Sequence, residues 1–252
     1  MFVECRAVAS LSGAGTSFYL DVDFTADSSS IVLFGPSGSG KSLTLLALAG
    51  LLKPASGRIV IHGKTFFDHR TGVNIPAQKR RVGFVFQDYA LFPHLTVWDN
   101  VAFGLKRPLR PLSREQRQKV NDLLELFGIA SLAHRRPHQI SGGQRQRTAL
   151  VRALAPDPSL LLLDEPFTAL DQPLRAKMRE ELARIQERFN VPMVMVSHDL
   201  ADVDAFAETL VAFGHGRVLQ VLDYRERRSE GESAADILTP LFEAANGTNA
   251  AG

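Results

Sequence analysis

The chain has 252 residues, 45% hydrophobic and 22% charged, a composition that excludes a wholly disordered or collagen-like protein. Its 29 Lys and Arg residues and 27 Asp and Glu residues leave a net charge of +2, which argues against a general nucleic-acid binder held by phosphate contacts. The single cysteine, Cys5, excludes an internal disulfide and a cysteine-cluster metal site. No apolar run reaches the ~18 residues of a membrane-spanning helix, and the first residues do not resemble a signal peptide, so a cytoplasmic protein is expected.

Strand and helix patterns alternate in the first part of the chain. Residues 2–9 and 18–24 are rich in β-forming side chains and predict two strands joined by a Gly-Ala-Gly turn. Residues 31–34 form a short apolar run typical of a buried parallel strand. A glycine-rich loop follows, and an apolar helix is expected over residues 41–52, ending before Pro54.

Helical signals dominate the middle of the chain, from about residue 88 to 158. Thr96 and Ser113 each begin a capping-box pattern, and the second of these helices is expected to stop at Gly128. Beyond this region, residues 160–163 again predict a buried strand.

Apolar side chains at helical spacing then predict one more helix, whose buried face would carry Leu174, Met178, Leu182, Ile185 and Phe189. Residues 191–196 predict the next strand. This strand–helix–strand order indicates a parallel α/β sheet into which the helical middle region is inserted. From Tyr224 onward the chain is charged and then small and polar, and the last ten residues are expected to be disordered.

A pattern typical of phosphate-binding loops follows the first buried strand: Gly35-Pro36-Ser37-Gly38-Ser39-Gly40-Lys41-Ser42. Its glycines let successive backbone N–H groups point inward, and the helix that follows adds its positive N-terminal end. Lys41 can reach the β- and γ-phosphates of a nucleotide, and the Ser42 hydroxyl can bind Mg²⁺. A loop that merely joins a strand to a helix is the structural alternative, but the buried strand before it and the helix after it favour nucleotide binding.

Two acidic residues, Asp164 and Glu165, stand at the C-terminal end of a buried strand. In parallel sheets this edge is where ligands bind. With a phosphate loop in the same chain, Asp164 is expected to hold Mg²⁺, directly or through water. Glu165 is expected to accept a proton from attacking water.

Three further motifs complete the pattern. Gln87 ends a strand-like run, His198 follows the strand at 191–196, and the sequence Ile140-Ser141-Gly142-Gly143-Gln144-Arg145-Gln146-Arg147 precedes the acidic pair. Together with the phosphate loop and the carboxylates, these residues resemble the ATP-binding subunits of ABC transporters. The resemblance runs in order from about residue 2 to 222.

This resemblance implies an α/β fold, namely a P-loop NTPase (RecA-like) core with an antiparallel β subdomain and an inserted α-helical subdomain. The ABC-type ATPase domain would occupy residues 1–230. Its core would span about 1–87 and 159–222 with the helical insertion at about 88–158, and residues 231–252 would form a partly disordered tail.

The resemblance also implies roles in ATP hydrolysis, with ATP and Mg²⁺ as cofactors. Gln87 would sense Mg²⁺ and the attacking water, and His198 would contact the γ-phosphate and position that water. Asp171 would lie in a loop that connects two sites across a homodimer. The ATP held by the other subunit would be contacted by Ser141, Gly142, Gly143 and Gln144. A serine and two glycines at a helix N-terminus form a second anion cradle, so ATP would join the two subunits.

The segment Gln87–Val97 resembles the version found in bacterial importers of small solutes, where it receives a short helix from the membrane permease subunits. Leu91, Phe92 and Leu95 could line such a socket or pack inside the helical subdomain. The run Asn74–His94 looks most like the molybdate group, although sulfate and other importers share much of it. A periplasmic or extracellular solute-binding protein is the implied indirect partner, and the cytoplasmic face of the inner membrane the implied location.

Molybdate subunits commonly carry a C-terminal β domain that binds the oxyanion; only 30 residues follow Leu222, so regulation by internal oxyanion binding is not expected. An importer ATPase for sulfate, a sugar or iron remains an alternative, as does a soluble non-transport ABC ATPase. The presence of Glu165 and His198 argues against a nucleotide-binding scaffold without hydrolysis. The residue that stacks on adenine stays unassigned, with Phe18 and Tyr19 the nearest aromatic side chains.

Overall fold

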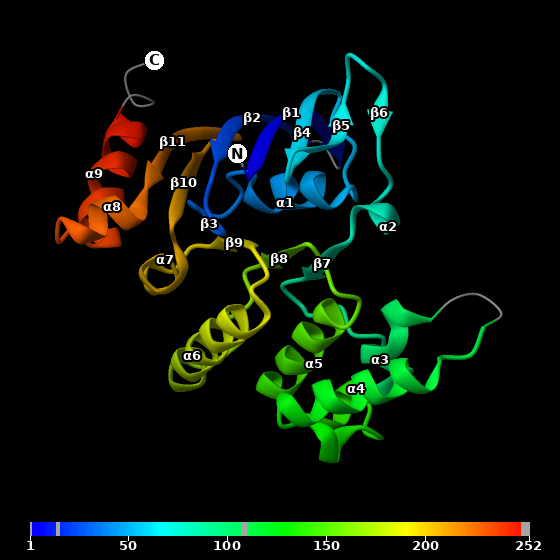
Figure 1. Ribbon diagram of the computed structural model, residues 1–252. Helices are drawn as coiled ribbons and strands as arrows, with labels where there is room; N and C mark the ends of the chain where they lie inside the picture. The colour runs from blue at the N-terminus through cyan, green and yellow to red at the C-terminus, as the bar shows by residue number, and fades with distance from the viewer. Residues whose placement is uncertain (1, 14–15, 107–109, 248–252) are drawn as a thin grey trace. The chain divides into compact units, whose positions relative to one another are not determined.

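The computed structural model describes residues 2–13, 16–106 and 110–247, and the chain forms two compact units (Figure 1). Unit 1 comprises Met1–Arg80 and Met193–Gly252, and unit 2 comprises Arg81–Pro192. The helical insertion expected at 88–158 lies within unit 2. The Gly-Ala-Gly turn expected at 13–15 falls on residues 14–15, which lie outside the described ranges.

Unit 1 contains an antiparallel group of strands, built from β1 (Val3–Gly13), β2 (Thr16–Ala26), β4 (Ser56–Ile61), β5 (Lys64–Asp68) and β6 (Val73–Asn74). Strand β1 pairs with both β2 and β4, and β5 pairs with β4 and β6. Alternate residues of β1 face the core, as expected for a strand with one buried face. Among them Cys5 is fully buried, and burial, reinforced by the nearby charges of Asp23 and Glu4, raises the pKa of its thiol to about 12.

The parallel strands of unit 1 are β3 (Ser30–Phe34), β9 (Met193–Ser197) and β10 (Thr209–Gly214), with β3 between the other two. Every residue of these three strands is buried, which matches the continuous apolar runs in the sequence. Strand β11 (Arg217–Asp223) runs antiparallel to β10 and parallel to β2, so it links the parallel strands to the antiparallel group.

The helices of unit 1 are α1 (Lys41–Ala49), α2 (Ala77–Arg80), α7 (Leu200–Phe206), α8 (Tyr224–Ser229) and α9 (Ala234–Gly247). Helices α7, α8 and α9 gather beside β10 (Figure 1). Helix α9 extends into the last ten residues, for which the sequence predicts disorder, and residues 248–252 lie outside the described ranges.

Helix α1 ends earlier than the sequence analysis predicts. Gly50 adopts a left-handed conformation, with φ of 78°, and donates its N–H back to the carbonyls of Ala47 and Leu46. A glycine in this position is a common helix stop because it has no Cβ to oppose the left-handed turn. The buried Arg80 side chain completes the end, donating to the carbonyls of Ala47 and Leu48 at 2.7 and 2.8 Å.

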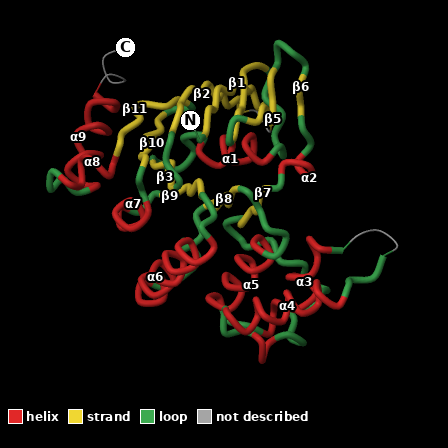
Figure 2. The backbone as a smooth tube through the Cα atoms, in the orientation of Figure 1, coloured by secondary structure: helices red, strands yellow, loops and turns green. Residues whose placement is uncertain are grey.

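Unit 2 is mainly helical, with one pair of parallel strands, β7 (Val82–Val85) and β8 (Leu160–Asp164) (Figure 2). Its α-helices are α3 (Val97–Ala102), α4 (Arg114–Leu126), α5 (Gly142–Leu154) and α6 (Gln172–Phe189). Short 3₁₀ segments lie at Phe103–Leu105, Ala130–Leu132 and Pro137–Gln139. Ser113 caps α4 in a full capping box, as predicted; Thr96 caps α3, but the Asp99 carboxylate accepts from the Thr96 hydroxyl.

The α/β class with an antiparallel β subdomain and a helical region is confirmed. Within residues 2–13, 16–106 and 110–247, no helix has both the length and the apolar character needed to cross a bilayer.

Candidate functional site

The phosphate loop connects β3 to α1 within unit 1, and three of its glycines have positive φ. Gly35 approaches the neighbouring strand so closely that a Cβ there would lie 2.4 Å from the carbonyl oxygen of Phe213. Gly38 has φ of 77° and open space around its Cβ position, and Gly40 has φ of 100° at the N-cap of α1. These conformations let the backbone curl as an anion cradle requires.

Lys41 is almost fully buried, and its ammonium group lies inside the loop. Its Nζ donates to the carbonyls of Gly35 and Pro36, both at 2.7 Å, and to the Ser39 hydroxyl at 3.3 Å. A buried positive charge held by the loop itself, at the N-terminal end of a helix, suits a polyphosphate ligand. The residues present therefore fit the nucleotide that the sequence pattern predicts.

A cavity of about 460 Å³ opens on this loop. Its walls are Phe34, Gly35, Pro36, Ser37, Gly38, Ser39, His198, His215 and Phe242. The structure thus brings His198, which is exposed and directly follows β9, to the same cavity as the loop, as the sequence analysis expects. His215 and Phe242 were missed. His215 sits in the turn between β10 and β11, Phe242 is on α9, and neither belongs to a recognisable motif.

A second cavity, of about 650 Å³, shares Gly38 and His215 with the first. Its remaining walls are Ser17, Phe18, Tyr19, Gly214, Arg217, Leu219 and Ala245. The turn after β10 borders both cavities through His215, and two backbone hydrogen bonds hold it in place. The Gly216 N–H donates to the Ser39 carbonyl, and the Asp21 N–H donates to the Gly216 carbonyl. Tyr19, a residue that is 52% exposed, offers an aromatic surface beside the phosphate loop.

The two predicted acids lie in unit 2, at the end of β8. Asp164 is the last residue of that strand and is 9% exposed. Glu165 has a left-handed backbone, with φ of 44°, and its carboxylate accepts a hydrogen bond from the Thr168 hydroxyl at 3.0 Å. A bulky residue is uncommon in the left-handed region of backbone conformation, where it costs conformational energy. Residues with such strain are frequent at functional sites.

The signature residues form the start of α5, also in unit 2. Ser141 is the N-cap: its hydroxyl accepts from the Gln144 N–H at 3.4 Å, and the Gln144 side chain accepts from the Ser141 N–H at 2.9 Å. The capping function expected as the structural alternative is therefore present. The glycines Gly142 and Gly143 occupy the first helical positions, where backbone N–H groups have no intrahelical acceptor.

Gln87 and Asp88 follow β7 and are exposed, whereas the next residue, Tyr89, is buried. Leu91, Phe92 and Leu95 are half-buried, so the predicted socket residues are partly used within unit 2. The Phe92 ring lies 4.3 Å from the Phe103 ring and below the Arg152 guanidinium.

The predicted Mg²⁺ ligands are distributed over both units, with Ser42 on α1 in unit 1 and Gln87 and Asp164 in unit 2. In the part of the chain that the structure describes, no group of three or more His, Cys, Asp or Glu side chains could hold a metal ion. A hydroxyl, a carboxylate and an amide are hard oxygen donors, and a Mg²⁺ bound by one or two such groups takes its other ligands from phosphate and water.

A glycine-rich loop between a buried strand and a helix, with its lysine folded into it, defines a P-loop nucleotide-binding protein. The family model for "ABC transporter" matches residues 20–168. The chain belongs to the ABC transporter family, as the resemblance implies.

Three curated relatives are importer subunits. "Sulfate/thiosulfate import ATP-binding protein CysA" of Mycobacterium tuberculosis is 48% identical over 79% of this chain and 55% of the relative. "Molybdenum import ATP-binding protein ModC" of Paramagnetospirillum magneticum is 43% identical over 80% and 54%. "Molybdate/tungstate import ATP-binding protein WtpC" of Archaeoglobus fulgidus is 40% identical over 87% and 86%. The chain thus spans about half of the length of the first two.

A solved dimeric structure of the ATP-binding cassette MJ0796, bound to ADP and Pi in a post-hydrolysis state, has the same fold. The TM-score is 0.73 at 29% sequence identity, covering 88% of this chain and 98% of that one. The predicted P-loop NTPase core is thereby confirmed.

Proposed function

We propose that this chain is the ATP-hydrolysing subunit of an ABC importer, which couples ATP binding and hydrolysis at a dimer interface to solute uptake. The observation that carries the proposal is the phosphate loop, in which Lys41 lies buried beside a cavity large enough for a triphosphate. Membership of the ABC transporter family supports it.

ATP binds with its phosphates on the loop at Gly35–Ser42 and its base in the adjoining cavity beside Tyr19. Ser42, Asp164 and Gln87 would be the residues that hold Mg²⁺, which would neutralise phosphate charge. Glu165 takes the proton of the attacking water, and His198 contacts the γ-phosphate. The left-handed backbone at Glu165 is compatible with this role.

Each ATP is shared between two copies of the chain. The phosphate loop of one copy binds it from one side, and the N-terminus of α5 in the other copy, at Ser141, Gly142, Gly143 and Gln144, binds it from the opposite side. Uncommitted N–H groups at a helix start favour a polyanion. The dimeric cassette MJ0796 supports this arrangement by its similarity.

The transported solute is an oxyanion, molybdate or one similar to it. The relatives named for sulfate, molybdenum and molybdate/tungstate import support this assignment. Permease subunits in the inner membrane dock at the segment after Gln87, where Asp88 is exposed, and the chain works at the cytoplasmic face. A solute-binding protein delivers the oxyanion from the other side. No nucleic acid takes part.

The decisive experiment uses Glu165→Gln, which keeps the shape of the side chain and removes the proton acceptor. General-base catalysis contributes about 10²–10⁴ in rate, so hydrolysis should slow by that factor while ATP still binds. The variant should therefore form a dimer on size-exclusion chromatography when ATP and Mg²⁺ are added. Adding Ser141→Arg should abolish that dimer, because it places a bulky side chain at the shared site.

The parent protein without nucleotide and Glu165→Gln with ADP are the controls. A Glu165→Gln protein that binds ATP tightly yet stays monomeric at every accessible concentration would contradict the shared site. Unchanged hydrolysis would remove Glu165 from its role as base.

A further inference from the structure

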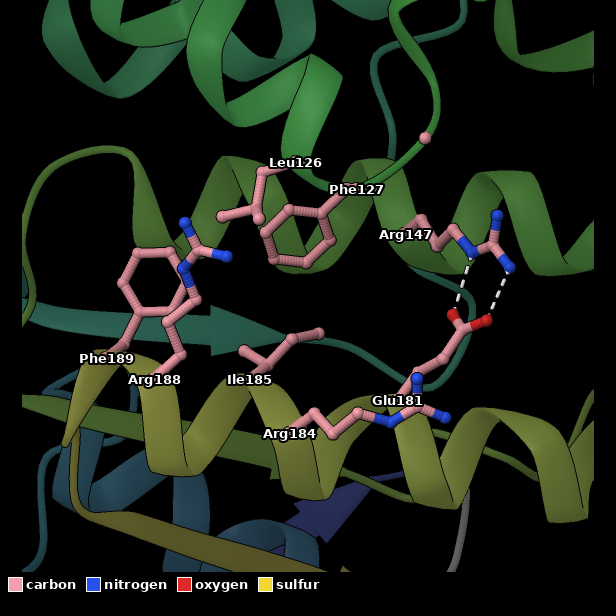
Figure 3. Close-up of a pocket in the computed structure, with 9 residues that line it drawn as sticks. Leu126, Phe127, Arg147, Glu181, Arg184, Ile185, Arg188 and Phe189 are labelled. Atoms are coloured by element: carbon pink, nitrogen blue, oxygen red, sulfur yellow. Dashed lines mark hydrogen bonds and ion pairs between the residues drawn. The ribbon is translucent and has the colours of Figure 1, made fainter.

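Arg147 of α5 and Glu181 of α6 form a two-pronged ion pair inside unit 2 (Figure 3). Arg147 Nε donates to Glu181 Oε2 at 2.9 Å, and Nη2 donates to Oε1 at 2.6 Å. The side chains are only 23% and 21% exposed. A guanidinium that grips a carboxylate with two parallel bonds fixes direction as well as distance.

The pair borders a cavity of about 390 Å³ with a largely apolar floor. Leu126 and Phe127, at the C-terminal end of α4, face Ile185 and Phe189 of α6 across it (Figure 3). Across the cavity, the centroids of the Phe127 and Phe189 rings are 6.4 Å apart. The Arg147–Glu181 ion pair is a specific polar contact between α5 and α6 at the edge of this cavity.

A second tie lies one helical turn earlier on α5. A Cβ placed on Gly143 would lie 3.3 Å from the Leu174 side chain, so the glycine allows α6 to come close. Arg147 follows Gly143 by four positions, and Glu181 follows Leu174 by seven, so each helix uses a single face for both ties. Two points of attachment on one face fix the rotation of α5 about its own axis relative to α6.

That rotation decides where the first N–H groups of α5 point. Helix α5 begins at Ser141, and α6 begins after Asp171, whose carboxylate caps it by accepting from the Leu174 N–H at 3.0 Å. The two helix starts that the family resemblance assigns to the dimer interface are thus joined through one rigid connection.

We propose that Arg147 and Glu181 are positioning residues that hold the signature end of α5 in the orientation that binds the ATP of the partner copy. The inference rests on the proposed function. The pair touches no nucleotide; it acts through α5. Its loss weakens ATP-dependent dimerisation and leaves the phosphate loop of the same copy, which belongs to unit 1, unchanged.

The test is Glu181→Gln in the Glu165→Gln background, with Glu180→Gln as the matched control. Glu180 is the adjacent residue and is 72% exposed in a 3.4 Å pair with Arg184, so Glu180→Gln removes the same charge from an exposed pair without the two-bond geometry. Charged hydrogen bonds of this kind contribute enough free energy that their loss should be measurable. We expect Glu181→Gln to raise the protein concentration at half-dimerisation at least about tenfold. Glu180→Gln should leave it unchanged, and the ATP affinity of the monomer should match the parent in both.

Arg147→Lys keeps the positive charge but cannot form two parallel hydrogen bonds with Glu181. It should therefore raise the concentration at half-dimerisation by an intermediate factor. Melting temperatures recorded for each variant separate positioning from stability. Suppose that Arg147→Lys and Glu181→Gln both melt at a lower temperature than the parent but dimerise at the same protein concentration. The ion pair is then structural only, and the proposal is overturned. Equal shifts for Glu181→Gln and Glu180→Gln overturn it as well. If the Glu165→Gln parent itself fails to dimerise, the proposed function fails instead.

Discussion

At the scale of single residues, the phosphate loop and the acid after β8 both include backbone with positive φ, but only the loop has glycine there. The loop has glycine at each position whose φ is positive, namely Gly35, Gly38 and Gly40. Glu165 adopts φ of 44° without that relief, and left-handed backbone costs a non-glycine residue roughly 1–2 kcal/mol. Glu165 therefore carries a conformational cost that the glycines of the loop avoid.

Tyr19 is the residue that we expect to carry the base of the nucleotide. Loss of an aromatic stacking partner costs about 1–3 kcal/mol per base, so Tyr19→Ala should weaken ATP binding roughly 5- to 150-fold. Tripolyphosphate has no base, and its affinity should stay unchanged in this variant. Isothermal titration of both ligands measures the two effects.

Lys41→Ala is the matched comparison, because it removes a phosphate contact and should weaken both ligands. Equal losses for ATP and tripolyphosphate in Tyr19→Ala would show that the ring does not contact the base.

Residues in motifs could be found from the sequence, and residues brought to the site by the fold could not. The loop, Asp164, Glu165 and His198 belong to patterns with fixed spacing and a chemical reason. Phe242 reaches the phosphate-loop cavity only because α9 packs beside β10 and α7, and its ring lies 6.0 Å from that of Phe34. No local pattern around residue 242 encodes that contact.

At the scale of elements, the end of α1 shows what periodicity alone misses. The apolar pattern continues to Leu52, but Gly50 stops the helix by turning left-handed. The partner that completes this end, Arg80, is distant in sequence. Burial lowers the pKa of its guanidinium to about 10, and its donors are taken up by the carbonyls of Ala47, Leu48 and Ile75.

The packing of α5 on β7 depends on a glycine in the strand. A Cβ on Gly83 would lie 2.6 Å from the Ala153 carbonyl oxygen, which belongs to the helix backbone and cannot rotate away. Gly83→Ala should therefore force the helix outward and lower the free energy of unfolding by about 1–3 kcal/mol. Urea denaturation measures this change.

Gly72→Ala provides the contrast, since Gly72 has φ of 72° and open space at its Cβ position. Gly72→Ala should lower the free energy of unfolding by roughly 1–2 kcal/mol, because alanine is strained at positive φ. It should not disturb dimerisation through the N-terminus of α5. Gly83→Ala, which shifts α5, should weaken that dimerisation. Dimerisation of Gly83→Ala at the same concentration as the parent would contradict this role of Gly83.

At the scale of the whole molecule, the sequence predicts which strands are buried on both faces and which on one, but not which strands pair. Continuous apolar runs mark the buried parallel strands β3, β8 and β9, and alternation marks β1 and β2. The pairing of β11 with β10 follows from a two-residue turn, with φ of 49° at His215 and 80° at Gly216. The pairing of β11 with β2 joins segments far apart in the chain and has no short-range sequence signal.

The solute can be tested in the source organism. Deleting the gene should slow uptake of molybdate, or of a similar oxyanion such as sulfate, when that ion is limiting. Isotope uptake measured in parallel for both anions identifies the substrate. The wild-type gene should restore uptake, and the Glu165→Gln gene should not, because its ATP hydrolysis is slowed. Intact oxyanion uptake with loss of a sugar or an amino acid would contradict the assignment.

The burial of Cys5 has a practical consequence for thiol labelling. Maleimides and bifunctional cross-linkers react with the thiolate, and a fully buried thiol with a pKa of about 12 supplies almost none at neutral pH. Because it is the single cysteine of these 252 residues, the natural sequence already serves as a silent background. A cysteine introduced at the exposed Asp88 would be the one reactive handle, so any permease captured by a short cross-linker would report contact at that position.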